Sequence, residues 1–411
     1  MIRLIYPILL ALFKTGVSLH ALINNKSRRL LAGRKEALSY LNTHHVHNQP
    51  LIWVHCASVG EYEQGRPVIE AIRHQYPEMS ILLTFFSPSG LESVATDAAD
   101  YQCLLPSDFR KNAQHFVKIT RPVMAIFVKY EFWYNYLKAL KDNNIPSYCI
   151  SAVFRPQFPY FKWYGGFYRQ MLRLIDKFMV QDIQSQQLLQ SIGINAVVCG
   201  DSRVDRVVEL KLSQQPFPVI ETFVEGDEQI MIFGSLRKGD LPLVLPFIHT
   251  HHELKYIIAP HEVEGHVIKV LRQEFPQSQL YSTSSTHQRE RNRILLIDCV
   301  GILSRLYRFA DFAYIGGAFD DGLHNILEPA IFQLPLFFGN KKFDAFIEAI
   351  ELIDMGAAFP VGSFEEFSLV FHDLIATSER KEKIRNQIAA YIQKQTGATH
   401  RILKEINFDL P

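Results

Sequence analysis

The sequence predicts an α/β protein with two doubly wound parallel sheets. Short apolar runs alternate with longer helix-forming stretches, which is typical of parallel strands covered by helices on both faces. This alternation stops at a polar, Pro-containing stretch, 211–228, and then starts again. The chain has 411 residues, which is too long for one ordinary hydrophobic core. We therefore expect two Rossmann-like domains.

The strands and helices follow from the hydrophobic pattern. Apolar runs bounded by turn residues predict buried strands at 51–55, 81–86, 124–130, 147–151, 196–200, 230–234, 256–260, 294–298, 312–317 and 334–339. Helices fit between the earlier strands, around 66–75, 90–98 and 132–142. The first of these helices has Pro67 near its start, where a missing N–H costs little. The stretch 364–406 has a helical pattern.

The domain boundaries follow from the same pattern. We expect a hydrophobic and basic anchor at 1–35, a first domain at 36–210, a linker at 211–228 and a second domain at 229–411 that includes the C-terminal helices. Open parallel sheets bind ligands beyond the carboxyl ends of their strands. Two such sheets facing each other would therefore place the active site in a cleft between the domains.

The composition excludes several classes of function. A formal net charge of +1 provides no global attraction for nucleic acid. The cysteines are far apart and form no CxxC pair, which predicts buried thiols in a reducing compartment: Cys56, Cys103, Cys149, Cys199 and Cys299. No DxD motif is present, and two histidine clusters lack other ligands at metal-binding spacing: His44, His45 and His47, and His249, His251 and His252. The adjacent Asp320 and Asp321 are typical of a solvated loop, so we expect no required metal ion.

The amino terminus is apolar and then basic. The apolar run 4–13 is interrupted by Lys14 and His20, and a basic cluster follows: Lys26, Arg28, Arg29, Arg34 and Lys35. One alternative is a short helix that spans the membrane once, with the basic cluster holding the following chain in the cytoplasm. An amphipathic helix in the headgroup layer would instead place the basic residues near anionic lipid. A soluble helix packed on the body is the third reading.

Candidate chemistry begins after the first predicted strand. In the segment HCASVGEYEQGRP (55–67), a tight turn places Glu61 at the amino terminus of the next helix. A carboxylate there can act as a general base for a hydroxyl acceptor, or merely offset the helix dipole. After the second strand, Ser87 and Ser89 predict either an anion pocket or ordinary helix capping.

Two further charged residues follow predicted strands of the first domain. Glu131 lies beside Lys129 and Trp133, a combination found in sugar sites and equally at helix starts. Arg203, in the segment GDSRVDRV (200–207), can meet a phosphate or a carboxylate.

The second domain holds the sharper motif. In 314–339, a strand ends at Gly316 and Gly317, and a helix begins near Asn325 or Ile326 with Glu328 in its first turn. Backbone amides there can bind a phosphate, and Glu328 can accept hydrogen bonds from ribose hydroxyls. The ordered set GG, HNxxEP and a later Pro is typical of nucleotide-sugar transferases.

The motifs WVHCASVGEYEQGRP, LLTFFSPSG, GDSRVDRV and HNILEP together resemble those of the Kdo (3-deoxy-D-manno-octulosonic acid) transferases of lipopolysaccharide synthesis, over nearly the whole chain. The resemblance implies a GT-B fold, CMP-Kdo as donor and a lipid A precursor as acceptor. It also implies a place at the cytoplasmic face of the inner membrane, with the catalytic domains on the cytoplasmic side.

The resemblance also implies residue roles. The catalytic base falls on Glu61, and the transition-state stabilisers fall on Glu131 and on Arg203, where relatives carry Lys. CMP-binding positions fall on Pro260, His261, Val300, Gly301, Ile302, Asn325, Ile326, Leu327 and Glu328. The family often has Pro-Arg where this chain has Pro260-His261, and Met-Gly-Glu where it has Val300-Gly301-Ile302. Arg237, Lys341 or Lys342 are the candidates to compensate for the lost phosphate contact.

The expected reaction inverts the sugar configuration, because the sequence offers one base and no convincing nucleophile for a double displacement. Two rivals remain. One is a transferase or epimerase that uses a UDP-sugar, which shares the second-domain motif but not the SVGE segment. The other is a non-catalytic membrane protein that binds lipid A or a nucleotide.

Overall fold

The computed structural model describes residues 2–44, 49–212, 215–284 and 292–408. The chain divides into two compact units, Met1–Asp205 with Thr396–Pro411, and Arg206–Gln395. Each unit carries a parallel sheet that, in its described residues, has seven strands. The predicted fold class of two parallel-sheet α/β domains is confirmed at this level.

The first sheet has the order β3-β2-β1-β4-β5-β6-β7, and all of its pairings are parallel. Its strands are β1 (Leu51–Cys56), β2 (Ser80–Phe85), β3 (Tyr101–Leu104), β4 (Met124–Val128), β5 (Ser147–Ala152), β6 (Lys177–Val180) and β7 (Ala196–Val198). The five strands predicted for this unit are present, whereas β3 and β6 were not predicted. Both are four residues long and begin on half-buried residues, so their apolar signal is short.

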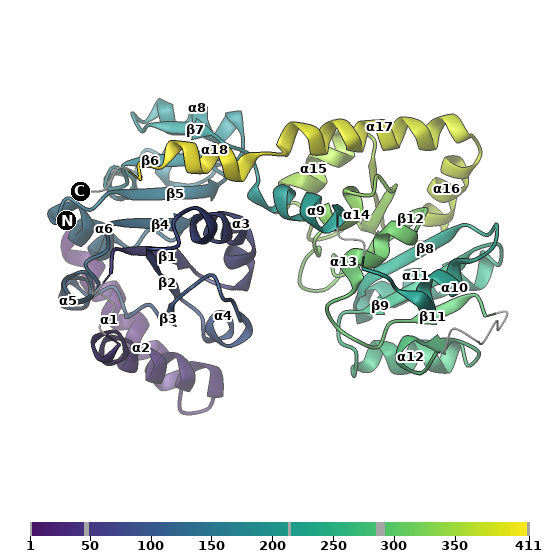
Figure 1. Cartoon of the computed structure of the whole chain (residues 1–411), viewed down its shortest axis with the longest axis horizontal. Coiled ribbons are helices and arrows are strands. Elements are labelled where there is room, and N and C mark those ends of the chain that lie inside the picture. The colour runs from purple at the N-terminus through teal and green to yellow at the C-terminus, as the bar shows by residue number, and fades with distance from the viewer. Residues whose placement is uncertain (1, 45–48, 213–214, 285–291, 409–411) are drawn as a thin grey trace. The chain divides into compact units, whose positions relative to one another are not determined.

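Helices cover both faces of the first sheet (Figure 1). They are α3 (Val59–Gln75), α4 (Pro88–Ser93), α5 (Arg110–Thr120), α6 (Tyr134–Asp142), α7 (Gly166–Leu172) and α8 (Ile183–Ser191), with a short 3₁₀ turn η1 (Pro159–Phe161). The prediction that Pro67 lies near the start of its helix was wrong. The helix begins at Val59, directly after the strand, so Pro67 lies in its interior.

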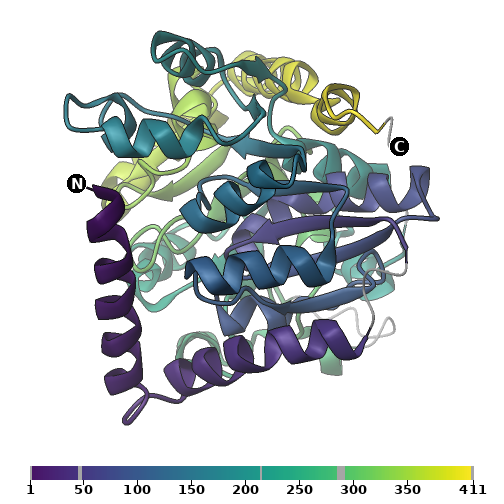
Figure 2. The ribbon, with the colours of Figure 1, turned by 90° about the vertical axis from the view of Figure 1, so that its left-hand side faces the viewer.

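Two helices precede the first sheet, α1 (Ile2–His20) and α2 (Asn25–Thr43), joined by a short turn (Figure 2). The α2 helix packs against β3 and continues past the predicted anchor boundary at residue 35, with Ala37 and Leu41 buried. The α1 helix contacts the body through Tyr6, whose hydroxyl donates to Asp108 at 2.5 Å. Among the described residues, no helix combines the length and apolarity of a membrane span.

The second sheet repeats the pattern with the order β10-β11-β9-β8-β12-β13-β14, again parallel throughout. Its strands are β8 (Ile230–Leu236), β9 (Lys255–Pro260), β10 (Gln279–Leu280), β11 (Ile294–Leu296), β12 (Phe312–Ile315), β13 (Leu336–Gly339) and β14 (Ala358–Val361). The five strands predicted here are present. The short edge strands β10 and β14 were not predicted.

The helices of the second unit surround its sheet. They are α10 (Pro218–Val224), α11 (Leu241–Thr250), α12 (His266–Glu274), α13 (Leu303–Leu306), α14 (Leu327–Ala330), α15 (Ile347–Asp354), α16 (Phe364–Ile375) and α17 (Ser378–Gln395), with 3₁₀ turns η2 (Lys238–Asp240), η3 (Tyr281–Thr283) and η4 (Tyr307–Phe309). The α9 helix (Ser202–Leu212) carries the chain from the first unit to the second.

The structure corrects the predicted linker at 211–228. This stretch contains the last turn of α9 and the whole of α10, and it belongs to the second unit. Phe217 and Ile220 are buried there, and the Arg305 and Arg308 guanidinium groups lie over the Phe217 ring. The prolines that suggested a linker instead flank Phe217, and Pro218 begins a short helix.

The structure also corrects the C-terminal boundary. The last helix, α18 (Ala398–Glu405), packs on α3 of the first unit, although the sequence analysis placed it in the second domain (Figure 1). Ile402 and Ile406 are buried among residues of the first core. The Asp205 carboxylate accepts hydrogen bonds from the backbone N–H groups of Gly397 and Thr399, so it holds the start of α18 in place.

Candidate active site

Glu61 lies in the first turn of α3, directly beyond the carboxyl end of β1. A turn of two residues joins the fully buried strand β1 to α3. The second of these residues, Ser58, has an extended backbone and is the N-cap of α3. The Ser58 hydroxyl donates a hydrogen bond to the Glu61 carboxylate. The side chain remains partly exposed. The carboxylate is thus held at a positive helix end and is accessible to a ligand.

Glu131 lies beyond the end of the neighbouring strand, β4. The backbone leaves β4 through Lys129, whose φ of +64° is in the left-handed region and redirects the chain toward Glu131. Its carboxylate accepts a hydrogen bond from the Trp133 indole N–H at 3.0 Å. The buried His55 of β1 places its Nε2 atom 3.6 Å from the same oxygen.

The structure brings Glu61 and Glu131 to the same edge of the first sheet. Burial raises the pKa of the Cys56 thiol well above its usual value, and the negative charges of Glu61 and Glu131 raise it further. Since β1 and β4 are neighbouring parallel strands, the two glutamates that follow them lie at the same edge.

Arg203 also lies at this edge, in the first turn of α9 beyond β7. Its guanidinium donates to the Asp201 carboxylate at 3.0 and 2.6 Å. Burial alone would raise the pKa of Asp201, but Arg203 and then Lys129 lower it. The Ser202 hydroxyl donates to the Gln64 carbonyl at 2.5 Å, which ties the start of α9 to the helix that carries Glu61.

The two serines after β2 support the capping interpretation. Ser87 is the N-cap of α4, and its hydroxyl accepts a hydrogen bond from the Gly90 N–H at 3.3 Å. The Ser89 hydroxyl lies 2.9 Å from that of Ser87. A larger residue than Gly90 would collide with Phe85, since an added Cβ would lie 2.5 Å from its ring.

In the second unit, the glycine pair at the end of β12 is required by close packing. A Cβ on Gly316 would lie 2.5 Å from the Ser235 carbonyl, and Gly317 has a φ of +97°. The buried Asp240 carboxylate accepts hydrogen bonds from the Gly317 N–H at 3.0 Å and the Tyr314 hydroxyl at 2.9 Å. Burial raises the pKa of Asp240. Asp240 therefore fixes the turn from which the HNxxEP loop departs.

The HNILEP segment forms the predicted helix start. Asn325 accepts from the Leu327 N–H at 3.1 Å and donates to the Glu328 carboxylate at 3.1 Å, and Ile326 is buried beneath them. Glu328 lies in the first turn of α14, as predicted. Burial raises the pKa of the Glu328 carboxyl, while the nearby Arg206 lowers it.

The other predicted donor-site residues also follow strand ends. Pro260 ends β9 and is buried. Val300, Gly301 and Ile302 lie in the loop before α13, where Val300 is exposed and Gly301 has a φ of +87°. The Gly301 carbonyl accepts a hydrogen bond from Arg305 at 2.8 Å.

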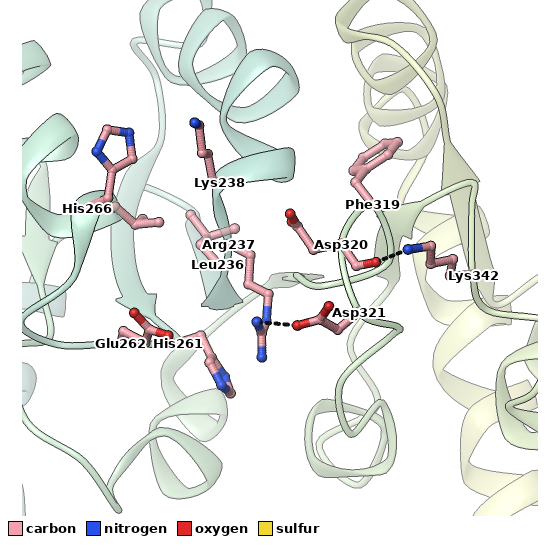
Figure 3. Close-up of a pocket in the computed structure, with 11 residues that line it drawn as sticks. Leu236, Arg237, Lys238, His261, Glu262, His266, Phe319, Asp320, Asp321 and Lys342 are labelled. Carbon is pink, nitrogen blue, oxygen red and sulfur yellow. Dashed lines mark hydrogen bonds and ion pairs between the residues drawn. The ribbon is translucent and has the colours of Figure 1, made fainter. Parts of the chain in front are cut away.

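A pocket of about 450 Å³ opens within the second unit at the carboxyl ends of β8 and β9 (Figure 3). Its lining consists of Leu236, Arg237, Lys238, His261, Glu262, His266, Val267, Phe319, Asp320, Asp321 and Lys342. Of the predicted donor-site residues, His261 lines this pocket, and the others lie outside the lining. Lys238, Glu262 and His266 were not predicted because they follow strands in segments without a motif, and Phe319 was not predicted because it is one apolar residue in the loop after the glycine pair.

Arg237 is the central cation of this pocket. Its Nε donates to the His324 Nε2 at 3.2 Å, and its other arm pairs with the exposed Asp321 at 2.8 Å. The His261 and His324 rings stack at 4.5 Å. Burial and then the positive charge of Arg237 lower the pKa of His261, and burial and then His261 lower that of His324 to about 4. Both imidazoles are therefore neutral near pH 7.

Of the three cations that were candidates to compensate for the arginine absent at position 261, two line the pocket and one does not. Arg237 points into the pocket beside His261, and Lys342, whose ammonium donates to the Asp320 carbonyl, also lines it (Figure 3). Lys341 instead lies over the Phe319 ring at 5.8 Å and is absent from the lining.

In the described ranges, no group of three or more His, Cys, Asp or Glu side chains is placed to hold a metal ion. His45 and His47 lie outside the described residues. Asp320 accepts a hydrogen bond from the Gly239 N–H at 2.9 Å, so both adjacent aspartates have protein partners.

Known proteins with similar sequences include Kdo transferases. Residues 31–206 match the family model described as 3-deoxy-D-manno-octulosonic-acid transferase (kdotransferase). The chain is 26% identical to the enzyme of that name from Chlamydophila psittaci, over 88% of this chain and 83% of the relative. It is also 26% identical to that of Aquifex aeolicus, over 84% of this chain and 92% of the relative.

The fold has solved counterparts. The structure of UDP-GlcNAc 2-epimerase from Methanocaldococcus jannaschii matches with a TM-score of 0.53 at 14% identity, over 86% of this chain and 98% of that chain. The two units thus resemble those of GT-B glycosyltransferases and the related epimerases. The family match covers Glu61, Glu131 and Arg203, and the resemblance identified in the sequence is confirmed. The chain is thus similar to the Kdo transferases, through the family model that matches residues 31–206 and through relatives that align with most of its length.

Proposed function

We propose that this protein transfers Kdo from CMP-Kdo to a hydroxyl of a lipid A precursor, with inversion, in lipopolysaccharide core synthesis. The observation that carries the proposal is the placement of two carboxylates, Glu61 and Glu131, beyond neighbouring parallel strands at one sheet edge, inside the segment that matches the family. The pair supplies what an inverting transfer needs, a base for the acceptor and a charge near the reacting sugar.

Glu61 takes the proton from the acceptor hydroxyl as its oxygen attacks the anomeric carbon of Kdo. The bond from that carbon to the CMP phosphate breaks, and CMP leaves with the electron pair. Ser58 holds the Glu61 carboxylate by a hydrogen bond, so the base is oriented before the acceptor arrives. Glu131 and Arg203 stabilise charge that develops in the transition state.

The donor binds to the second unit. Arg237 and Lys342 in the 450 Å³ pocket are suited to an anionic phosphate. The neutral His324 accepts a hydrogen bond from the Arg237 guanidinium, which orients it and leaves its positive charge available to the phosphate. Asp321 is exposed and acts as a counter-ion that a phosphate displaces. The loop at Val300–Ile302 and the Asn325–Glu328 helix start bind the nucleoside, with Glu328 accepting from ribose hydroxyls.

The membrane is contacted from the first unit, at the cytoplasmic face of the inner membrane. Several apolar residues of α1 and of the turn after it are exposed: Ile8, Leu9, Leu12, Phe13, Leu19, Leu22 and Ile23. Lys26, Arg28 and Arg29 follow at once and are also exposed. An exposed apolar helix beside a basic cluster is suited to the headgroup layer of an anionic membrane.

The test uses detergent-purified full-length protein, CMP-Kdo and a tetraacylated lipid A precursor, with mass spectrometry of the lipid. Addition of one or more Kdo units supports the proposal and counts the transfers. If CMP binds and no sugar is added, the acceptor assignment fails. If CMP does not bind, the donor assignment fails, and competition by UDP would then favour a UDP-sugar enzyme. CMP binding without CMP release from the donor would indicate a non-catalytic binding protein.

A further inference from the structure

A buried histidine with an unused ring nitrogen lies beneath the candidate active site. His55 is the fifth residue of β1, and its exposed fraction is 0%. Among the described residues, its Nε2 atom has no hydrogen-bond partner. A buried polar atom without a hydrogen-bond partner is destabilising, so its presence calls for a physical reason.

The other ring nitrogen of His55 carries a proton. Its Nδ1 atom lies 3.1 Å from the backbone carbonyl of Thr84 and 2.9 Å from the Thr84 hydroxyl. A carbonyl oxygen only accepts, so Nδ1 must donate. The Thr84 hydroxyl oxygen also accepts the Trp53 indole N–H at 2.8 Å, and its own hydrogen is directed to the Val54 carbonyl at 3.4 Å. The network therefore assigns the Nδ1–H form.

This assignment determines what Nε2 presents to Glu131. In a neutral imidazole with Nδ1–H, Nε2 carries a lone pair, and that lone pair faces the Glu131 Oε2 atom at 3.6 Å. A lone pair facing a carboxylate oxygen in a buried site is repulsive. One proton between the two atoms turns the repulsion into attraction, whether it resides on Nε2 or on Oε2.

We propose that His55 and Glu131 hold one proton between them, and that His55 is a positioning residue that sets the charge and orientation of Glu131. The Trp133 N–H, which donates to the same carboxylate oxygen, favours the form with the proton on Nε2. The pair is then an imidazolium and a carboxylate with no net charge. This inference rests on the proposed function only in placing Glu131 at the transfer site.

The surroundings leave Glu131 as the charged partner of His55. The imidazole is enclosed by Trp53 on its own strand, Thr84 of β2 and Phe127 of β4, none of which is charged. Around Glu131, other titratable groups act electrostatically and come from different elements: Arg34 of α2, Cys56 of β1 and Tyr160 of η1.

The first test is spectroscopic and needs no substrate. Full-length protein labelled with ¹⁵N on histidine is compared with the Glu131→Gln variant at pH 7. In the wild type, both ring nitrogens of His55 are expected at protonated or strongly hydrogen-bonded shifts. In Glu131→Gln, Nε2 is expected to shift to the lone-pair position, because the carboxylate that held the proton is gone. A wild-type Nε2 already at the lone-pair position would overturn the proposal.

The second test measures the pH profile of turnover. In His55→Gln, Glu131 loses its imidazolium partner, so the acid limb of the kcat profile should move to higher pH. A conservative His55→Asn variant provides a second variant if His55→Gln fails to fold. A uniform loss of kcat with an unmoved profile would mean a purely structural role. An inactive wild type would instead contradict the proposed function and leave the spectroscopic result standing.

Discussion

At the scale of single residues, Glu61 is held in place by Ser58 and by its position at a helix amino terminus. Replacing Glu61 by Gln keeps the shape and removes the base. We expect kcat for Kdo transfer to fall by about two to four orders of magnitude, the usual contribution of a positioned general base. Initial rates of lipid product measure this. Glu63→Gln, two residues further along α3, is the control, and its kcat should equal that of the wild type. Wild-type rates in Glu61→Gln would refute the role of Glu61 as the base.

Arg237 is the residue-scale test of the donor pocket. Arg237→Ala removes a charged hydrogen-bond donor from the pocket and leaves His324 without its partner. We expect CMP to bind about 10- to 100-fold more weakly, because a hydrogen bond to a charged group contributes about 1.5–3 kcal/mol. Calorimetry with CMP gives the dissociation constant. Arg272→Ala, an exposed arginine on α12 outside the pocket lining, should bind CMP normally. Equal affinities in the two variants would exclude Arg237 from the phosphate site.

The sequence predicted Glu61 and Glu131 because each follows an apolar strand within a few residues, and it predicted Glu328 because that residue belongs to the HNxxEP motif. His55 and Asp240 could not be predicted as site residues. His55 looks like one polar residue inside a strand, and its importance depends on Thr84, which is 29 residues away in the chain. Asp240 acts through a backbone N–H of Gly317, a contact that only the folded sheet creates.

At the scale of elements, Asp108 joins α1 to α6. It accepts from the Tyr6 hydroxyl and from the N–H groups of Asn135 at 3.2 Å and Tyr136 at 3.1 Å. Burial raises the pKa of Asp108 from 3.8 to about 7, although these hydrogen bonds lower it. The folded state therefore binds a proton more tightly than the unfolded state does, so the favourable contribution of the protonated form is lost as pH rises from about 4 through about 7.

The Asp108→Asn variant should lack this pH dependence. We expect the Tm of the wild type to fall relative to that of Asp108→Asn as pH rises from 5 to 8, measured by circular dichroism at each pH. Asp97→Asn, at an exposed aspartate of the same unit, should follow the wild-type curve. Parallel curves for wild type and Asp108→Asn would show that Asp108 does not titrate in this range.

The α1 helix is the element on which the proposed membrane contact depends. Replacing Leu9 and Leu12, which are 55% and 64% exposed, by serine removes apolar surface without disturbing the core. We expect binding to vesicles that contain anionic phospholipid to weaken at least tenfold in a flotation assay, because each leucine contributes about 1.5–3 kcal/mol of burial. Leu369→Ser, at a leucine of α16 that is 71% exposed, is the matched control. Unchanged flotation of the double variant would remove α1 from the membrane contact.

At the scale of the whole molecule, two separate segments of the chain form the first unit, Met1–Asp205 and Thr396–Pro411. The α18 helix contributes Ile402 to the first core, and Phe408 stacks on Tyr76 with ring centroids 4.2 Å apart. The sequence predicted the helical pattern of 364–406 correctly and placed α16 and α17 in the right domain, but it placed α18 in the wrong one. A helix shows which face is apolar, but the sequence does not say which sheet will cover that face. The position of α18 along the chain favoured the second domain, whereas in the structure hydrogen bonds to Asp205 hold its start in the first unit.

Ile402→Ala tests this assignment. We expect a loss of about 2–5 kcal/mol in the free energy of unfolding of the first unit, the usual cost of truncating a buried isoleucine. Hydrogen exchange read peptide by peptide should accelerate in β1 and β5 and stay unchanged in β8 and β12. Lys404→Ala, at an exposed residue of the same helix, should change neither. Faster exchange in β8 would place the contribution of α18 in the second unit.

The return of α18 has a consequence for how the protein is made. A ribosome adds about 5–20 residues per second, so roughly 10–40 s separate the synthesis of Asp205 from that of α18. Throughout that interval the first sheet is complete, yet the apolar surface that receives Ile402 and Ile406 has no cover. The nascent chain therefore exposes an apolar patch until α18 has been synthesised, and a chaperone that binds apolar surface would find its site there.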